Sequence, residues 1–330
     1  MNKQNTTAII LNPAARDWKA KKNWPFIEKT LRQHNINFEK FDTVADNKET
    51  VETVSQITEQ GYGRIVAVGG DGTQNLIING IMKADLAPEQ RPEYALFPCG
   101  TANDIGGSFD IRMPKFSKKE IVECIQTLTR GTLYNLDLGL INNQTYFADS
   151  FGIGFDASVL EHRNRTRKER MIFRQGKQSY APSIVNELAG NYTRPKAELI
   201  IGGKKTKTKI FNLVINNVQI YAGRFILHPD IRANDGLLDL NNYRNNQAYL
   251  SEMGTQGIEG ILELIDPTKL TKKAVRMAIE NSRHYQAKTI DISLSKPTTT
   301  QVDGEEYEIG DEFKVECVKH ALKLVINYER

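Results

Sequence analysis

Short apolar runs alternate with amphipathic stretches along the first part of the chain, up to Gly131. The runs are rich in β-branched and aliphatic residues, as in strands that are covered on both faces. The stretches between them carry apolar residues three and four positions apart, which predicts helices. The predicted strands are Ala8–Leu11, Phe38–Phe41, Arg64–Val68 and Tyr94–Phe97, and the predicted helices are Lys19–Gln33, Val51–Gln60, Thr73–Ala84 and Lys118–Thr129. This alternation predicts an open, mostly parallel α/β sheet.

The pattern changes after Gly131, where short strand candidates separated by turn residues follow one another. They are Leu133–Leu140, Thr145–Phe151, Lys196–Ile201, Ile210–Asn216, Leu237–Asn241, Thr289–Leu294 and Glu312–Val318. We therefore expect an α/β domain at residues 1–131 and a β-rich, sandwich-like domain at residues 132–330. A last strand candidate, Leu322–Ile326, could pair in either domain.

The composition is that of an ordinary globular protein, with 330 residues, 39% hydrophobic and 25% charged. A net charge of +4 does not by itself argue for nucleic acid, and we expect none as a partner. The three cysteines lie far apart and form no CxxC pair, which favours a reducing compartment over disulfides. No apolar run approaches the roughly 20 residues of a membrane span. We expect a cytoplasmic protein whose membrane contact, if any, is peripheral.

Two glycine turns follow two of the predicted parallel strands, GGDGT at 69–73 and GTAND at 100–104. Glycines let backbone N–H groups face an anion, and the following helix start adds partial positive charge. A carboxylate beside a phosphate, as at Asp71, is repulsive unless a metal ion or a hydrogen-bond donor lies between them, which suggests Mg²⁺ or a ribose nearby. Because ligands bind at the carboxyl ends of parallel strands, both turns can border one crevice that suits a nucleotide with Mg²⁺. The alternative is a plain strand-to-helix turn with a capping residue.

Six motifs occur in a fixed order along nearly the whole chain. They are NPAAR at 12–16, GGDGT at 69–73, PCGTAND at 98–104, FGIGFDASV at 151–159, NDGLLDL at 234–240 and VDGEE at 302–306. GGDGT alone also resembles turns of NAD kinases and phosphofructokinases. The six together resemble the diacylglycerol kinase catalytic-domain family, and within it the soluble bacterial lipid kinases. The resemblance implies an α/β nucleotide domain, a β-sandwich domain and an active site in the cleft between them.

The resemblance also implies where ATP and Mg²⁺ bind. The implied ATP-binding residues are Asn12, Pro13, Ala14, Ala15, Arg16, Thr43, Gly70, Asp71, Gly72, Thr73, Gln74, Asn75, Leu76, Gly100 and Thr101. Asp71, Asp104 and Asp137 match a carboxylate set that is linked through Mg²⁺ and water. Asp235 and the Leu237 carbonyl match a second, structural Mg²⁺ site.

Asp303 matches the general base that is proposed for the family, and Glu305 lies beside it; with Asp71 they form the implied catalytic set. Phosphoryl transfer needs positioning, charge neutralisation and a carboxylate that accepts the proton of the attacking hydroxyl. We expect Asp303→Asn to leave folding intact and to abolish turnover. The alternative for Asp303-Gly304 is a hairpin turn without chemistry.

The segment Arg163–Lys177 carries seven basic residues and one acidic residue around Met171, Ile172 and Phe173. Basic side chains around an apolar tip favour contact with an anionic membrane surface. A solvated basic helix face and a nucleic-acid patch are the alternatives. The family resemblance makes a homodimer plausible.

Three positions depart from the family pattern. Leu76 replaces a usual glutamate, Arg16 replaces a usual glycine, and Arg232 cannot donate a side-chain oxygen to the structural Mg²⁺. We expect an ATP- and Mg²⁺-dependent kinase that phosphorylates a lipid hydroxyl, with diacylglycerol as the first candidate. The alternatives are a non-catalytic protein that binds nucleotide or lipid, and a kinase of a soluble hydroxyl substrate, as NAD kinases are.

Overall fold

Two β-sheets and the helices around them make up the computed structural model of the chain. It describes residues 3–100, 102–111, 113, 115–170, 194–223, 225–246, 248–249 and 282–327. The larger sheet has ten strands and runs through both halves of the chain, and a second sheet of six strands lies in the β-rich half. A short two-stranded ribbon, β11 (Ile220–Tyr221) and β12 (Phe225–Ile226), completes the described strands.

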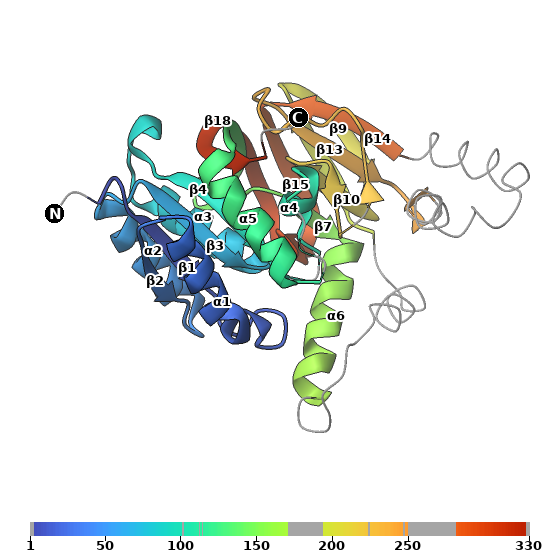
Figure 1. Ribbon diagram of the computed structural model, residues 1–330. Helices are drawn as coiled ribbons and strands as arrows, with labels where there is room; N and C mark the ends of the chain where they lie inside the picture. Colours follow the sequence, from blue (N-terminus) through green and yellow to red (C-terminus); the bar gives the residue numbers. More distant parts are fainter. Residues whose placement is uncertain are drawn as a thin grey trace, which may run out of the picture.

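The first half folds as the apolar pattern predicts. Its parallel strands are β1 (Thr7–Leu11), β2 (Phe38–Asp42), β3 (Arg64–Gly69) and β4 (Glu93–Pro98), in the spatial order β2-β1-β3-β4. Its helices are α1 (Lys19–Gln33), α2 (Asn47–Glu59), α3 (Asp71–Lys83), a 3-10 turn (Pro88–Gln90), α4 (Asp104–Ser108) and α5 (Lys118–Arg130). Helix α1 packs with α5, and α2 packs with α3 (Figure 1). The strand order reverses between β1 and β3, which is where open α/β sheets bind ligands.

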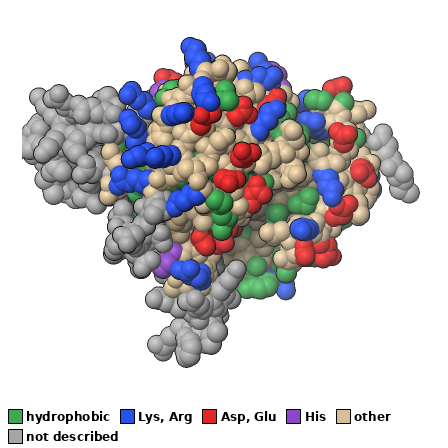
Figure 2. Space-filling model, turned by 180° about the vertical axis from the view of Figure 1, so that it is seen from behind, with side chains coloured by type: hydrophobic (Ala, Val, Ile, Leu, Met, Phe, Trp, Pro, Cys, Tyr) green, Lys and Arg blue, Asp and Glu red, His purple; other side chains and the backbone are tan. Residues whose placement is uncertain are grey.

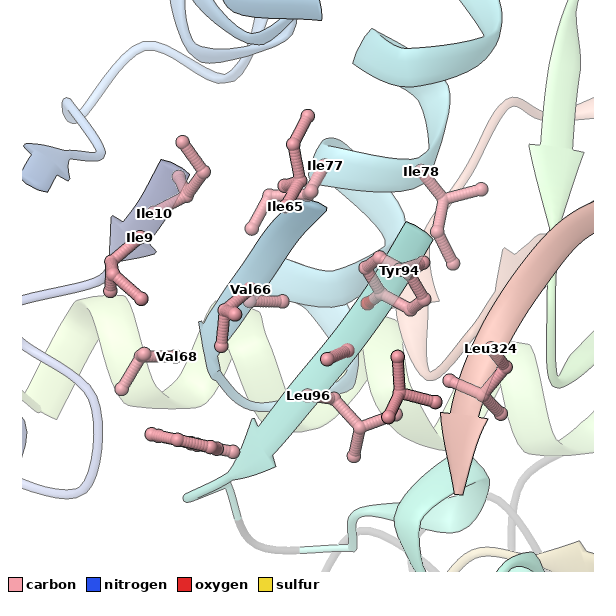
Figure 3. Close-up of a cluster of buried hydrophobic side chains, with 14 of the residues drawn as sticks. Ile9, Ile10, Ile65, Val66, Val68, Ile77, Ile78, Tyr94, Leu96 and Leu324 are labelled. Atoms are coloured by element: carbon pink, nitrogen blue, oxygen red, sulfur yellow. The ribbon is translucent and has the colours of Figure 1, made fainter. Parts of the chain in front are cut away.

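The core of this half lies between the central strands and the helices that cover them. Ile9, Val66 and Leu96 come from three neighbouring strands and are buried together (Figure 3). Leu324, which is almost 230 residues further along the chain than Leu96, lies beside Tyr94 in the same cluster. The last long strand of the protein therefore belongs to the core of the first half.

That strand is β18 (Gly310–Ile326), which joins the two halves into one sheet. It runs parallel to β4 and antiparallel to β5 (Thr132–Ile141) and β15 (Thr289–Thr298). Its register with β5 shifts between Val318 and Leu322, where His320 has a positive φ of 53°. The sequence predicted two strands here, and the irregularity at His320 explains the interruption of the pattern. β6 (Thr145–Phe147), β8 (Lys196–Ile201) and β9 (Lys204–Lys209) complete the sheet.

The six-stranded sheet covers the β-rich half of the larger sheet. Its order is β14 (Ser282–Ala287), β13 (Leu238–Tyr243), β10 (Asn212–Asn216), β7 (Ser150–Gly154), β16 (Thr300–Val302) and β17 (Glu305–Glu306). One face contributes apolar side chains such as Phe151 and Leu240 to a core shared with β15 and β18. These sheets confirm the expected fold class, an α/β half followed by a β-rich, sandwich-like half. The boundary near residue 131 stays a prediction, because β5 pairs with β18 in the shared sheet.

Helix α6 (Phe155–Arg170) follows β7 and extends away from the body of the molecule (Figure 1). Among the described residues, no helix is both long and apolar enough to cross a membrane.

Candidate active site

The two glycine turns touch each other at the carboxyl ends of β3 and β4. A methyl group on Gly100 would lie 2.5 Å from the Cα atom of Gly70, and one on Gly70 would lie 2.8 Å from the Cα atom of Gly100. The Cys99 N–H donates to the Gly69 carbonyl at 3.0 Å, which fixes the first turn beside the second. The turns therefore border one site, and a side chain on either glycine would force them apart.

We predict that Gly100→Ala separates the turns. Overpacking of this kind costs about 1–3 kcal/mol, and the displaced backbone N–H groups can no longer face an anion. Isothermal titration with ATP is expected to show weaker binding than in the unchanged protein. Gly203→Ala, in the turn between β8 and β9, is the control: its positive φ of 81° strains that turn, but open space surrounds it, so ATP affinity of the folded variant should be unchanged. Equal ATP affinity of the unchanged protein and Gly100→Ala would contradict the assignment.

The segment after β1 lies against the start of α3. The Asn12 side-chain amide donates to the Thr73 hydroxyl at 2.9 Å, and the Thr43 N–H donates to the Leu11 carbonyl at 2.9 Å. The structure thus brings the predicted Asn12–Arg16 segment and Thr43 to the same edge as the glycine turns. Arg16 has a positive φ of 52°, which favours the glycine usual at this position, and its guanidinium donates to the Met113 carbonyl at 2.8 Å.

Not every predicted nucleotide contact faces this edge. Gln74 is fully buried, and both polar atoms of its side chain lack a hydrogen-bond partner among the described residues. Leu76 is partly buried one turn into α3. Thr101 lies outside the described residues. The remaining predicted contacts, Pro13, Ala14, Ala15, Gly70, Gly72 and Asn75, belong to the segment after β1 or to the start of α3.

The carboxylate of Asp71, the first residue of α3, ties the two turns together. It accepts the N–H groups of Asn103 and Asp104, at 2.7 and 3.0 Å. Asp104 in turn accepts the N–H of Gly223 in the β11–β12 turn, at 2.5 Å. Asp71 and Asp104 therefore join β3, β4 and the β-rich half at one place, as the sequence predicted for two members of the Mg²⁺ set.

Asp149 is a member of this group that the sequence analysis missed. It is buried between β6 and β7, and it accepts the Ser150 hydroxyl at 3.2 Å through Oδ2. Its Oδ1 is buried and has no hydrogen-bond partner among the described residues. Burial, together with the charges of Asp104, Asp303 and Asp71, raises the pKa of Asp149 well above its ordinary value. The only signal in the sequence is a polar Asp-Ser pair inside the apolar stretch Thr145–Phe151.

The negative charges of buried carboxylates that lie close together repel one another when no cation is bound. Burial and this repulsion raise the pKa values of Asp71, Asp104 and Asp149. Burial and the charge of Asp104 raise the pKa of Asp71 to about 7. Burial also raises the pKa of Asp104 to about 6, although backbone donors partly oppose it. The carboxylate oxygens of these three aspartates lie further apart than the direct ligands of one small ion would. Among the described residues only one group of three potential ligand side chains is that close, and it lies elsewhere. Mg²⁺ usually keeps several of its water ligands in proteins, so carboxylates that are more widely spaced can still hold it through those waters.

The raised pKa values predict how stability depends on pH. The folded protein holds protons on Asp71 and Asp104 up to pH 6–7, whereas the unfolded chain releases them near pH 4. The free energy of unfolding therefore falls as the pH rises through this window. In thermal unfolding we expect a higher Tm at pH 5 than at pH 7.5 without Mg²⁺. Mg²⁺ should raise the Tm more at pH 7.5, where both carboxylates are ionised. An equal Mg²⁺ effect at both pH values would contradict the site.

Asp303 sits at the centre of the hydrogen bonds that join the two halves. It is buried at a positive φ of 47° and accepts from the Asn75 amide at 2.8 Å. It also accepts three successive backbone N–H groups, those of residues 148, 149 and 150, at 2.8–3.1 Å. Burial raises the pKa of Asp303, and these four donors lower it. A carboxylate has about four acceptor positions, so that of Asp303 is fully occupied.

Glu305 is the exposed neighbour of Asp303, on strand β17. A methyl group on Gly72 would lie 2.4 Å from its Oε1 atom, so its carboxylate lies directly over the GGDGT turn. Asp303 and Glu305, which the sequence analysis placed in one catalytic set, therefore have different surroundings. Asp303 is buried and its carboxylate accepts four hydrogen bonds, whereas Glu305 extends from the β-rich half to the edge with the glycine turns.

Asp137 does not join the Asp71–Asp104 group through its hydrogen bonds. It is fully buried on β5, and its carboxylate accepts the N–H groups of Gly236 and His320, at 2.7 and 2.6 Å. Asp235 is exposed in the same loop and accepts the Leu237 N–H at 2.9 Å. The structure thus places Asp137 beside the predicted structural Mg²⁺ loop rather than among the carboxylates of the glycine turns.

The comparisons with known proteins agree with this architecture. Residues 6–141 match the diacylglycerol kinase catalytic domain, and residues 150–249 match the YegS C-terminal NAD kinase beta sandwich-like domain. A diacylglycerol kinase of Bacillus subtilis is 26% identical over 226 residues, which cover 68% of this chain and 69% of that protein. One of Staphylococcus saprophyticus is 30% identical over 139 residues, 42% of each chain. For several curated relatives the match spans about half of their length.

A crystal structure of a diacylglycerol kinase from Bacillus anthracis shares the fold, with a TM-score of 0.67 at 18% identity over 98% of this chain and 97% of that one. The fold and the paired domain matches define a protein of the two-part type, with an α/β half followed by a sandwich-like half. The chain belongs to the diacylglycerol kinase catalytic-domain family.

Proposed function

We propose that the chain is an ATP- and Mg²⁺-dependent lipid kinase that transfers the γ-phosphoryl group to a lipid hydroxyl, with diacylglycerol as the first candidate. The observation that carries this proposal is the contact between Glu305 and Gly72 beside the paired glycine turns. It puts a solvent-accessible carboxylate of the β-rich half at the edge where the α/β half offers backbone N–H groups. The relatives' names, diacylglycerol kinase and lipid kinase, support the acceptor class.

In this proposal the turns at Gly70 and Gly100 bind the phosphates. Asp71 and Asp104 hold Mg²⁺, assisted by Asp149, whose buried Oδ1 lacks a partner among the described residues. Bound Mg²⁺ would neutralise phosphate charge. Asn12 and Thr73 fix the segment after β1 against the nucleotide.

We assign the role of proton acceptor to Glu305 and a positioning role to Asp303. A base must reach the attacking hydroxyl. Asp303 has four donors on its carboxylate, whereas Glu305 is exposed. The bonds of Asp303 instead fix the bend at residues 148–150, and the Asn75 bond ties that bend to α3.

Membrane contact remains part of the proposal, because a lipid substrate must be reached and no helix among the described residues could span a membrane. Helix α6 begins the basic segment, but the side chains of residues 167–170 and all of Met171–Lys177 lie outside the described residues. Strand β9 adds four exposed lysines on an edge strand. Figure 2 shows that Lys and Arg side chains gather on the side of the molecule that carries this strand. Such a surface suits anionic lipid. A homodimer stays a prediction.

The test is ATP consumption by the purified protein with Mg²⁺, with and without mixed micelles of diacylglycerol and anionic phospholipid. Lipid-dependent consumption with a phosphorylated lipid product is the expected result. ATP binding without consumption would identify a different acceptor or a non-catalytic protein. Consumption that is unchanged by the micelles would favour a soluble hydroxyl substrate. Absence of ATP binding would point to Arg16 and Leu76 as the residues that prevent it.

A further inference from the structure

A second polar group lies on the face of the six-stranded sheet that points away from the sandwich core. It consists of His228, Asp239 and His284, which come from the segment after β12 and from strands β13 and β14. Each offers one ligand atom, and these atoms lie within 4.8 Å of one another. This is the only group of three such side chains at that spacing among the described residues, and it contains none of the residues assigned above.

The register of the strands explains why these side chains meet. Asp239 pairs with Gln286 and Asn241 pairs with His284, so Asp239 and His284 are diagonal neighbours on one face. The His284 Nε2 atom is 2.7 Å from the Asp239 Oδ1 atom. Leu238 and Leu240 point the other way into the core, which keeps Asp239 directed outward.

The two histidines of the group lie face to face. Their rings are stacked, with centroids 4.0 Å apart and an angle of 9° between the planes. Neutral imidazole is the commonest metal ligand in proteins. Asp239 supplies the negative charge that a divalent ion requires, and it is 1% exposed, whereas His284 is exposed and leaves a path for the ion.

Unpartnered polar atoms around the group are a second, independent observation. The Nδ1 atom of His228 is buried and has no hydrogen-bond partner among the described residues. Asn216 pairs with Asp239 on the adjacent strand, and both polar atoms of its buried side chain also lack partners there. Buried polar atoms are normally satisfied, so unpaired atoms beside a potential ligand set need an explanation. A bound ion would give His228 a partner, and the Asn216 amide oxygen is available as a further ligand.

We propose that His228, Asp239 and His284 bind a divalent transition metal ion of the Zn²⁺ type. Zn²⁺ prefers imidazole and carboxylate ligands at about 2.0–2.2 Å, so the two stacked rings have to turn out of their parallel planes before both nitrogens can face one ion. Mg²⁺ prefers oxygen ligands and does not suit two imidazoles. Ligand atoms have to be free of protons to bind a metal ion, so metal affinity is expected to fall as the pH is lowered.

The ion would connect to the kinase site through one short segment. His228 follows the β11–β12 ribbon, and the turn of that ribbon donates its Gly223 N–H to Asp104. Fixing His228 to β13 and β14 therefore restrains the segment that reaches Asp104. This role concerns the position of the segment, and it requires no step of the kinase reaction.

The test uses the full chain without a histidine tag, stripped with a chelator and desalted. Titration with Zn²⁺ against a chromogenic chelator, and the visible absorption of bound Co²⁺, report binding. We expect a single Zn²⁺ site whose affinity falls by at least about tenfold in His228→Gln and in His284→Gln, as losses of this size already follow changes around metal ligands. His34→Gln, at the end of α1, is the matched control and should bind as the unchanged protein does. Circular dichroism checks that each variant is folded.

Absence of Zn²⁺ binding by the folded, unchanged protein would overturn the proposal. So would binding that survives in both histidine variants and is lost in Asp104→Asn, because the ion would then belong to the kinase site. Asp239→Asn is a further variant, but its burial makes the two histidine variants the decisive ones. None of these measurements depends on kinase activity, so failure here leaves the proposed function untouched.

Discussion

Glu305→Gln is expected to lower kcat by about 10²–10⁴-fold, the range that general-base catalysis supplies. The substitution keeps the size and the hydrogen-bonding capacity of the side chain but removes its ability to accept a proton. Glu305 is exposed on a two-residue strand, so the Tm should change little. ATP affinity should also be nearly unchanged, because the amide can still occupy the space over Gly72. Initial rates with diacylglycerol micelles, together with ATP titrations, measure both quantities.

Glu306→Gln is the matched control for this experiment. Glu306 is the next residue of β17 and is equally exposed, but side chains of successive strand residues point to opposite faces. Its substitution should therefore leave kcat unchanged. Equal activity of Glu305→Gln and the unchanged protein would remove Glu305 from the role of proton acceptor. A joint loss in both variants would indicate an effect of charge on the whole strand.

Asp303→Asn is expected to destabilise the fold by about 2–4 kcal/mol as well as to lower turnover. The carboxylate accepts four donors, two at each oxygen. An asparagine side chain keeps one acceptor oxygen and places an NH₂ group against the other two donors. Those donors are buried and would lose their partners. Chemical denaturation, read as the shift in midpoint at constant slope, measures the change.

This expectation corrects the sequence-based one, in which Asp303→Asn left folding intact. Asp311→Asn on the exposed start of β18 controls for the loss of one negative charge and should cost little. If Asp303→Asn is as stable as that control, the four hydrogen bonds are not important for folding. If it is less stable yet retains turnover in the folded fraction, Asp303 has no part in positioning the site.

Local patterns predicted the α/β half well because its elements are long and periodic. Helix α1 begins and ends at the predicted residues, and the four parallel strands differ from prediction by one residue at each end or less. Strand β9, Lys204–Lys209, was missed because it contains no apolar residue and lies at the edge of the sheet. The predicted strand Thr145–Phe151 is two strands, since the chain bends at Ala148 and Asp149, whose N–H groups donate to the Asp303 carboxylate.

The candidate site was predicted from motifs and a family resemblance, and neither indicates the contacts that the register of distant strands decides. The resemblance groups Asp137 with the Mg²⁺ set, and the structure adds that its carboxylate bonds to the loop around Gly236. Asp149 lies in no motif used for the prediction, and only the pairing of β7 with β10 and β16 brings it to Asp303. The contact between Asp239 and His284 depends on the register of β13 with β14. Nothing in local spacing indicates such contacts.

Strand β18 has a consequence for how the protein is made. It covers the edge of β4 through Leu324 and Tyr94, but it is synthesised after the other helices and strands that the structure describes. During translation the first half therefore emerges with an open strand edge, a surface that readily pairs with other chains. The nascent α/β half cannot complete its sheet until residues 310–326 have left the ribosome. The first half can therefore finish folding only after β18 has been synthesised. A fragment that stops near residue 131 would keep the edge of β4 exposed.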